Sequence, residues 1–254
     1  MDVVSLIVRG DDFGLCHAAN QAIWEAFETG VLTCASLAVT GPWTAEAVAI
    51  VRAHPEWEIG LQLVLRCATA GCRWSPVAGA AAVPSLVDSA GALAPSLPAT
   101  AHPDDIAREL AAQVERACAW GIQPAYLEYD GDPHAAVDVE LHRLSEQLGA
   151  PARMTSWGVE PLAVPSAETQ GWDQALLGEL SALRPGVHLW VTRPAQDSPE
   201  TWSLWASEEA ARARHAEALM LCSPDVSALI RQRGIELISF RQHLEARLGT
   251  DADE

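Results

Sequence analysis

Short apolar runs alternate along this chain with longer stretches in which apolar residues recur every three or four positions. The first pattern is typical of strands buried on both faces, and the second of amphipathic helices. The apolar runs predict strands over residues 3–9, 31–39, 59–65, 124–129, 152–155, 187–192 and 235–239. Because strands that alternate with helices form parallel sheets, we expect an α/β fold, either a barrel or a doubly wound sheet.

The helical stretches complete this picture. They predict helices over 17–29, 44–53, 173–183 and 207–221, a helix that begins at Pro103, another that ends near residue 148, and a terminal helix after residue 239. The clearest boundaries belong to a helix that Ser223 caps and Gly234 closes, with Pro224 in its first turn. No internal repeat or linker divides these elements, so we expect a single domain over residues 1–248.

Two segments do not follow the alternation. Residues 66–102 are rich in Ala, Pro and Ser and show no convincing period. A loop of this length inside a compact domain is usually functional, so we expect an insertion or lid beside the site. Residues 249–254 form an acidic tail.

The composition excludes several kinds of chemistry. The chain has 254 residues and a net charge of −18, and its 16 basic residues are all arginines. Without lysine it cannot form the Schiff bases of pyridoxal phosphate or class I aldolase enzymes, nor hold a phosphate with a Walker lysine. The G-x-S-x-G element of serine hydrolases is also missing. Carboxylate, histidine, arginine or metal chemistry remains.

The excess of acidic over basic residues also limits which molecules the protein can bind. A negative surface repels phosphate backbones, so we expect neither nucleic acid nor a membrane as a partner, but a small molecule, a sugar or an aromatic compound. No apolar run reaches the length of a membrane span, and no basic region precedes the first apolar run, so the expected location is the cytoplasm. A homodimer is left open.

Polar residues that carry chemistry lie at or near the ends of several predicted strands. They comprise four carboxylates, an amide, a histidine and an arginine: Asp11, Asp12, Asp130, Asp132, Gln62, His134 and Arg193. Because ligands bind at the carboxyl ends of parallel strands, we expect these residues to share one cleft. Structural roles are the alternative, since aspartates cap helices and form turns, and a glutamine in a strand can be a hydrogen-bonded buried amide.

Four segments resemble one protein family. Residues 6–15 read LIVRGDDFGL, residues 30–37 read GVLTCASL, residues 60–65 read GLQLVL and residues 234–239 read GIELIS. Together they resemble the YdjC/ChbG family of carbohydrate deacetylases. The resemblance implies a TIM-barrel-like, distorted (β/α) barrel of about seven parallel strands. It also implies a hydrolase that removes acetyl groups from N-acetylated sugars with a divalent metal.

The resemblance assigns roles to the residues near the strand ends. Asp11 falls on the family's general base, and Asp12 on an aspartate ligand of the metal. The two histidine ligands fall on Gln62 and Asp130, and a later histidine that assists as an acid falls on Arg193. The implied metal site (Asp12, Gln62 and Asp130) contains only oxygen ligands, which favours Mg²⁺ or Mn²⁺ over Zn²⁺. An arginine in place of the acid would stabilise an oxyanion or hold a substrate carboxylate.

Further residues complete the candidate site. Asp132 and His134 are candidates for acid–base catalysis. The chain holds 10 tryptophans against 3 phenylalanines, and tryptophans beside a pocket stack on sugar rings or aromatic ligands. The predicted substrate-binding residues are Arg153, Trp157, Trp190 and Glu128.

The sequence leaves three functions open. The first is a metal-assisted deacetylase that acts on an acetamido sugar or a related N-acyl compound. The second is an acid–base enzyme on the same scaffold that works without a metal on a different substrate, aromatic or a biosynthetic intermediate. The third is a non-catalytic homologue that only binds a ligand.

Overall fold

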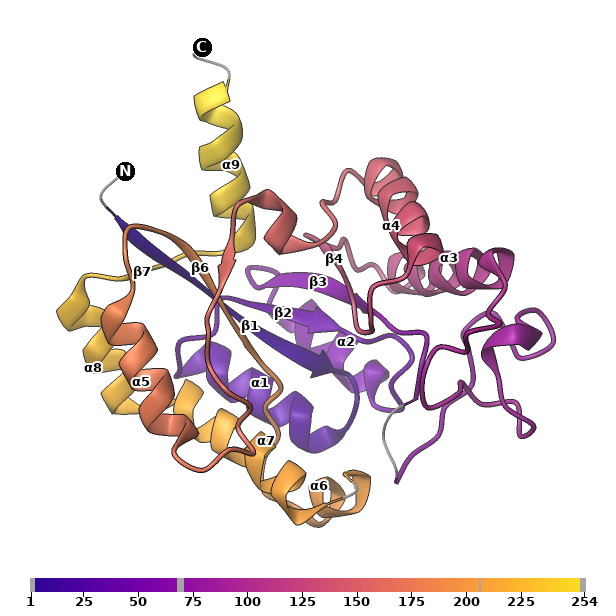
Figure 1. Ribbon diagram of the computed structural model, residues 1–254, viewed down its shortest axis with the longest axis horizontal. Helices are drawn as coiled ribbons and strands as arrows, with labels where there is room; N and C mark the ends of the chain where they lie inside the picture. The colour runs from indigo at the N-terminus through magenta and orange to yellow at the C-terminus, as the bar shows by residue number, and fades with distance from the viewer. Residues whose placement is uncertain (1–2, 68–70, 206, 252–254) are drawn as a thin grey trace.

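The computed structural model describes residues 3–67, 71–205 and 207–251, and within them seven parallel strands form one curled sheet (Figure 1). The strands are β1 (Val4–Phe13), β2 (Cys34–Leu37), β3 (Glu58–Leu63), β4 (Leu127–Tyr129), β5 (Glu160–Pro161), β6 (Gly186–Thr192) and β7 (Glu236–Leu237). Their order is β4-β3-β2-β1-β6-β5, and β7 pairs with the start of β1. Residues 1–2 of the predicted domain, 68–70 of the predicted insertion and 252–254 of the acidic tail lie outside the described residues.

The strand β1 lies within the sheet and pairs with three other strands. β6 pairs with one edge from Val4 to Gly10. The other edge is shared between β7, at Ser5 and Leu6, and β2, from Arg9 onward. Over the described ranges the pairing path ends at β4 and β5, so the sheet is a distorted barrel that is not fully closed, as predicted.

The end of β1 is longer than predicted and carries a bulge. The strand continues through Asp11 and Asp12 to Phe13, whereas the sequence predicted an end at Arg9. Its register with β2 shifts between Gly10 and Phe13, and Asp12 adopts a φ of 67°, which residues other than glycine rarely do. Such a bulge changes the direction of the side chain that it carries.

Helices cover the outside of the sheet. They are α1 (His17–Glu28), α2 (Thr44–Ala53), α3 (Pro103–Ala119), α4 (Ala135–Leu148), α5 (Trp172–Ala182), α6 (Pro199–Leu204), α7 (Glu208–Leu221), α8 (Pro224–Arg233) and α9 (Phe240–Asp251), with short 3₁₀ turns η1 (Pro84–Leu86) and η2 (Met154–Trp157). The pair α3 and α4 lies at one end of the sheet and the pair α5 and α8 at the other (Figure 1). None of the helices in the described ranges is long and apolar enough to cross a membrane.

Further elements differ from the sequence prediction. The predicted strand over 152–155 is wrong, because Ala152 makes only an isolated bridge to Leu127 and the chain then enters η2. Arg153 has a φ of 57°, a left-handed conformation that cannot continue a strand. The fifth strand is instead β5. Helix α6 was not predicted, since its 6 residues are too few to show a helical period.

Side chains of β1 alternate between two hydrophobic clusters. Leu6 and Val8 pack in the large cluster beneath the helices. Ile7 points to the opposite face, inside the barrel, where it packs with Tyr126 and Phe240. Because successive residues of a strand alternate in direction, the side chains that follow Ile7 by two and four positions enter the same interior.

The predicted insertion is attached to the domain through α3. Within the described part of 66–102 the regular structure is limited to η1 and an antiparallel bridge between Val87 and Leu93. The fully buried carboxylate of Glu109, on α3, accepts hydrogen bonds from the backbone N–H groups of Val77 and Ala78. These bonds hold the segment against the barrel beside the end of β3.

Candidate functional site

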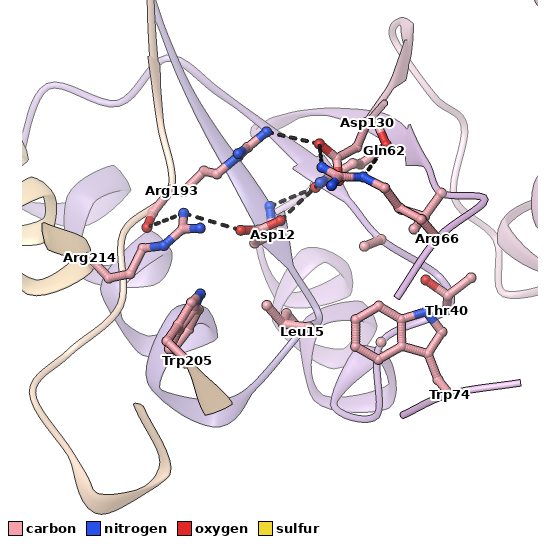
Figure 2. A pocket seen from close by; sticks show the side chains of 13 residues that line it. Asp12, Leu15, Thr40, Gln62, Arg66, Trp74, Asp130, Arg193, Trp205 and Arg214 are labelled. Atoms are coloured by element: carbon pink, nitrogen blue, oxygen red, sulfur yellow. Dashed lines mark hydrogen bonds and ion pairs between the residues drawn. The ribbon is translucent and has the colours of Figure 1, made fainter. Parts of the chain in front are cut away.

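A cavity of about 240 Å³ opens at the carboxyl ends of β1, β2, β3, β4 and β6, and we call it the strand-end cavity (Figure 2). Its charged and amide side chains are Asp12, Gln62, Arg66, Asp130, Arg193 and Arg214. Thr40 and two tryptophans, Trp74 and Trp205, also line it. Parallel α/β folds bind ligands at this edge of the sheet, so the cavity is the candidate functional site.

Asp12 lies at the centre of the cavity and is held by Gln62. The Asp12 backbone N–H donates to Gln62 Oε1 at 2.7 Å, and Gln62 Nε2 donates to Asp12 Oδ1 at 2.9 Å. This pair of bonds uses both ends of the Gln62 amide and joins the ends of β1 and β3. The left-handed backbone of Asp12 is therefore supported on both sides of its Cα.

Asp130, directly after β4, lies between two arginines. Arg193 Nη2 donates to Asp130 Oδ1 at 2.9 Å. Arg66 Nη2 lies 3.2 Å from both carboxylate oxygens, and Arg66 Nε donates to the backbone carbonyl of Asp130 at 3.1 Å. Asp130 thus joins the segment after β3 to the segment after β6.

Arg214, on α7, completes the ring of charges. Its Nη1 lies 3.3 Å from Asp12 Oδ2 and donates to the backbone carbonyl of Arg193 at 3.1 Å (Figure 2). The guanidinium lies over the ring of Trp205, 5.2 Å from the ring centre, in a cation–π contact. One turn further along α7, the carboxylate of Glu217 accepts a hydrogen bond from the Arg193 backbone N–H at 2.8 Å.

These contacts decide the charge of the carboxylates. Burial alone would raise the pKa of Asp12, but Arg214, Arg193, the hydrogen bond from Gln62 and Arg66 together hold this pKa below its usual value. For Glu217 the burial prevails and raises the pKa. The nearby Asp12 raises the pKa of Arg193 above its usual value. Asp12 is therefore ionised and Arg193 charged at neutral pH.

A family model described as YdjC-like protein matches residues 5–137. This range contains β1 to β4 and with them Asp12, Gln62 and Asp130. The chain belongs to the YdjC-like family. The family membership confirms the resemblance that the sequence segments indicated, and the distorted barrel agrees with it.

Relatives of this YdjC-like protein carry the names of sugar-modifying enzymes. A carbohydrate deacetylase of Geobacillus stearothermophilus is 29% identical over 93% of this chain and 96% of its own length. A chitooligosaccharide deacetylase of Serratia marcescens is 27% identical over 93% of this chain and 98% of its own length. Among solved structures, a protein of Enterococcus faecalis V583 named for cellobiose-phosphate cleavage superposes with a TM-score of 0.79 at 21% identity, covering 94% of this chain and 98% of its own. This last likeness concerns the fold.

The structure brings together four of the predicted site residues. Asp12, Gln62, Asp130 and Arg193 all line the strand-end cavity, although they come from four different strand ends. Asp11 does not line it. Its carboxylate lies in the barrel interior, where Arg9 Nε and Nη2 contact it at 2.9 and 3.1 Å.

The remaining predicted residues lie elsewhere. Glu128 pairs with Arg9 Nη1 at 3.0 Å, and its Oε1 also accepts the backbone N–H of Met154. Trp190 is buried in the cluster beneath the helices, so its ring is not available to a ligand. The others are absent from the lining that the described ranges give the cavity: Arg153 and Trp157 line a separate surface cavity, Asp132 is exposed, and His134 precedes α4.

Sequence reasoning did not assign several lining residues to the site, among them Arg66, Arg214, Trp74 and Thr40. Arg66 lies three positions beyond the last residue of β3, so the rule that ligands bind at strand ends applies to it as it does to Asp130. Arg214 belongs to the helix after β6, and only the fold shows that it reaches Asp12. Trp74 comes from the segment over 66–102, which has no hydrophobic period, so the sequence does not indicate which way the Trp74 side chain points.

The donor set does not fit a divalent cation. Asp12 Oδ1 accepts from Gln62, Asp12 Oδ2 faces Arg214, and the Gln62 oxygen accepts from the Asp12 backbone. Both oxygens of Asp130 face guanidinium groups. Within the described ranges no group of three His, Cys, Asp or Glu residues is placed to hold a metal ion. A cation at this position would have to displace positive charges that are already paired.

Proposed function

We propose that this YdjC-like protein is a hydrolase of the carbohydrate deacetylase type that cleaves the N-acyl bond of a small amino sugar without a resident divalent metal. The observation that carries the proposal is the placement of the Arg193 and Arg214 guanidinium groups around Asp12, where the family resemblance implies a metal ion. The names of the relatives support the reaction class. The position of the cavity at the strand ends supports the location of the site.

Hydrolysis of an amide needs a proton acceptor for the attacking water and positive charge at the acyl oxygen. Asp12 supplies the acceptor, since the neighbouring arginines keep it ionised. The N–H groups of Arg193 and Arg214 that have no partner in the described residues supply the positive charge. Water adds to the acyl carbon while its proton moves to Asp12, and the oxygen becomes an oxyanion held by the guanidinium groups. The C–N bond then breaks, the amine takes the proton from Asp12, and the acid is released.

The size of the cavity sets the size of the substrate. At about 240 Å³ it is smaller than the roughly 300–1,000 Å³ of pockets that hold drug-sized ligands. One sugar ring with its acyl group is therefore the expected occupant. The ring would pack on Leu15, Val64 and the indole of Trp205, which form apolar parts of the wall.

A second candidate function is ligand binding without catalysis. The observation that favours it is the low pKa of Asp12, because a carboxylate that holds its proton weakly is a poor general base at neutral pH. Under this alternative the same arginines bind the ligand, and no bond is cleaved.

The experiment is a measurement of acetate release from N-acetylglucosamine by protein that has been treated with a chelator and analysed for bound metals. We expect less than about 0.1 metal ion per chain, and release that the Asp12→Asn and Arg193→Gln variants lower by roughly 100-fold each. Arg212→Gln is the matched control, because Arg212 lies on the same helix as Arg214 but is exposed. Release that appears only after Mn²⁺ or Zn²⁺ is added would contradict the proposal. Sugar binding without release under any condition would favour the second candidate.

A further inference from the structure

Two buried polar groups in the strand-end cavity have no hydrogen-bond partner in the described part of the chain. They are Oγ1 of Thr40, a residue only 7% exposed, and the indole Nε1 of Trp74. Thr40 follows β2 and Trp74 belongs to the segment attached through α3, so two independent parts of the fold bring them to one cavity. Leaving a buried polar group without a partner costs about 1–3 kcal/mol, so a ligand atom that reaches these groups gains binding energy from them.

The free hydrogen-bond donors and acceptors of the cavity determine which kind of ligand atom fits. An indole N–H can only donate, and a guanidinium has five N–H groups and no acceptor. Arg66 uses Nε and Nη2 on Asp130, which leaves Nη1 without a partner within the described ranges. The acceptor oxygens of Asp12, Asp130 and Gln62 each already contact a donor of the protein, whereas the indole N–H and the remaining guanidinium nitrogen Nη1 contact no acceptor within the described ranges. The ligand therefore has to supply acceptor oxygens.

Charge narrows the choice further. The cavity lining carries three arginines against the two aspartates Asp12 and Asp130, so one positive charge is left without a counter-charge among these side chains. Glu217 lies behind the lining, where its carboxylate accepts the Arg193 backbone N–H, and burial raises its pKa. Arg9, Asp11 and Glu128 form their own group in the barrel interior. With three guanidinium groups against two carboxylates among its lining side chains, the cavity matches a monoanion better than a dianion.

We propose that Arg66, Thr40 and Trp74 form a subsite for the carboxylate of the ligand, so that the substrate is an acidic N-acyl sugar that carries one carboxylate. Figure 2 shows Trp74 and Thr40 on the side of the cavity from which Arg66 extends, while Arg193 and Arg214 lie across Asp12 from them. The carboxylate binds at the first group of residues, and the N-acyl group reaches the second. This inference deepens the proposed function and rests on it for the reaction, but the carboxylate preference is a property of binding.

The test measures binding by titration calorimetry at pH 7 and low ionic strength, where charge interactions are least screened. The probes are N-acetylglucosamine, the same sugar with C6 oxidised to a carboxylate, and N-acetylglucosamine 6-phosphate. We expect the carboxylate sugar to bind about 10- to 100-fold more tightly than the neutral sugar. Hydrogen bonds to a charged group contribute a free energy that corresponds to such a factor. The phosphate sugar should bind less tightly than the carboxylate sugar, because it carries more negative charge than the cavity balances.

Conservative variants locate the subsite. Trp74→Phe keeps the ring and removes the N–H, and Thr40→Val keeps the shape and removes the hydroxyl. Each should lower the affinity for the carboxylate sugar by roughly tenfold, so that the ratio between the affinities for the carboxylate and the neutral sugar falls. Trp24→Phe, at an exposed position of α1, is the matched control and should change neither affinity. Arg66→Gln should remove most of the preference for the carboxylate.

The outcomes separate this inference from the proposed function. Equal affinity for the neutral and the carboxylate sugar, or tighter binding of the phosphate, would overturn the carboxylate subsite. An unchanged preference in both Trp74→Phe and Thr40→Val would also overturn it. A clear carboxylate preference without any release of acetate from either sugar would support the subsite while the proposed hydrolysis fails.

Discussion

At the scale of single residues, the site depends on how charges of opposite sign are paired. Asp12 and Asp130 are shared among Arg66, Arg193 and Arg214, so each carboxylate faces at least one guanidinium. Arg9 pairs in the same way with Asp11 and Glu128 in the barrel interior. Of the two adjacent aspartates, only Asp12 is therefore available to the cavity. Adjacent residues of a strand already alternate in direction, and the bulge at the end of β1 changes the direction of Asp12 further.

The lowered pKa of Asp12 predicts a pH-dependent contribution to stability. A carboxyl group whose pKa is lower in the folded than in the unfolded state stabilises the fold above the unfolded value of about 3.9, and this contribution disappears as the pH falls through the folded value. Asp12→Asn should therefore lower the free energy of unfolding by about 1.5–3 kcal/mol at pH 7. The difference between wild type and variant should shrink when urea unfolding is repeated below pH 4. A difference that stays constant with pH would contradict the assignment of the charged form.

At the scale of elements, the irregular segment over 66–102 gives the cavity part of its wall. It supplies Arg66 and Trp74, and it is held by a buried carboxylate of α3 that accepts two backbone hydrogen bonds. Gln113, one turn further along α3, adds to this attachment, because its amide donates to the backbone carbonyl of Val64 and to Glu109. The position of Trp74 thus depends on polar side chains of a helix that does not itself line the cavity.

Removal of the Glu109 carboxylate should release the segment over 66–102. Glu109→Ala leaves the N–H groups of Val77 and Ala78 without their acceptor, so their amide hydrogen exchange should accelerate by at least about tenfold. The affinity for the carboxylate sugar should fall at the same time, because Trp74 is no longer held in place. Glu115→Ala, at an exposed position of the same helix, is the control and should change neither quantity. Unchanged exchange at Val77 and Ala78 would show that other contacts hold the segment.

At the scale of the whole molecule, the carboxyl end of the barrel differs chemically from the interior below it. The carboxyl end of the sheet holds the arginines and aspartates of the cavity, in a protein whose net charge is −18. The interior below contains the ion pairs of Arg9 with Asp11 and Glu128, and apolar groups among which are Ile7, Tyr126 and Phe240. Gly60 of β3 lies against the Tyr126 ring, and a Cβ atom built there would be 2.2 Å from it, so only glycine fits. The arginines of the cavity also show that the net charge of the chain does not determine the local charge that a ligand meets there.

The packing of Phe240 in the barrel interior provides a test of the fold. Phe240, the first residue of α9, is fully buried, its ring meets Tyr126 edge-on at 5.9 Å, and Glu58 of β3 accepts its backbone N–H. Phe240→Ala should lower the free energy of unfolding by about 3–5 kcal/mol, measured in urea. Leu248→Ala on the same helix removes an exposed side chain and should cost less than about 0.5 kcal/mol. Similar values for the two variants would show that Phe240 does not contribute to the packing of the barrel interior.

Much of the architecture was predictable from the sequence alone, because it rests on local patterns. The alternation of apolar runs with helical periods indicated parallel strands and helices, and the bounds of α2 and the cap of α8 follow from residues inside those elements. The short elements were not predictable in this way: the turn after Ala152 depends on a left-handed Arg153, and α6 spans less than two turns. The same local reasoning correctly placed Asp12, Gln62, Asp130 and Arg193 near strand ends, since a strand end is itself a local feature.

Only the tertiary structure decided what those residues contact. Arg66 follows β3 and Arg214 lies on α7, and no pattern in the chain shows that both reach the aspartates that follow other strands. The direction of Asp12 depends on a register shift between β1 and β2, which is a property of two strands together. The sequence by itself therefore determined the elements and the residue types at their ends. The charge and the hydrogen-bonding capacity of the cavity arise from side chains that meet across the barrel, and these are known only when the strands are assembled.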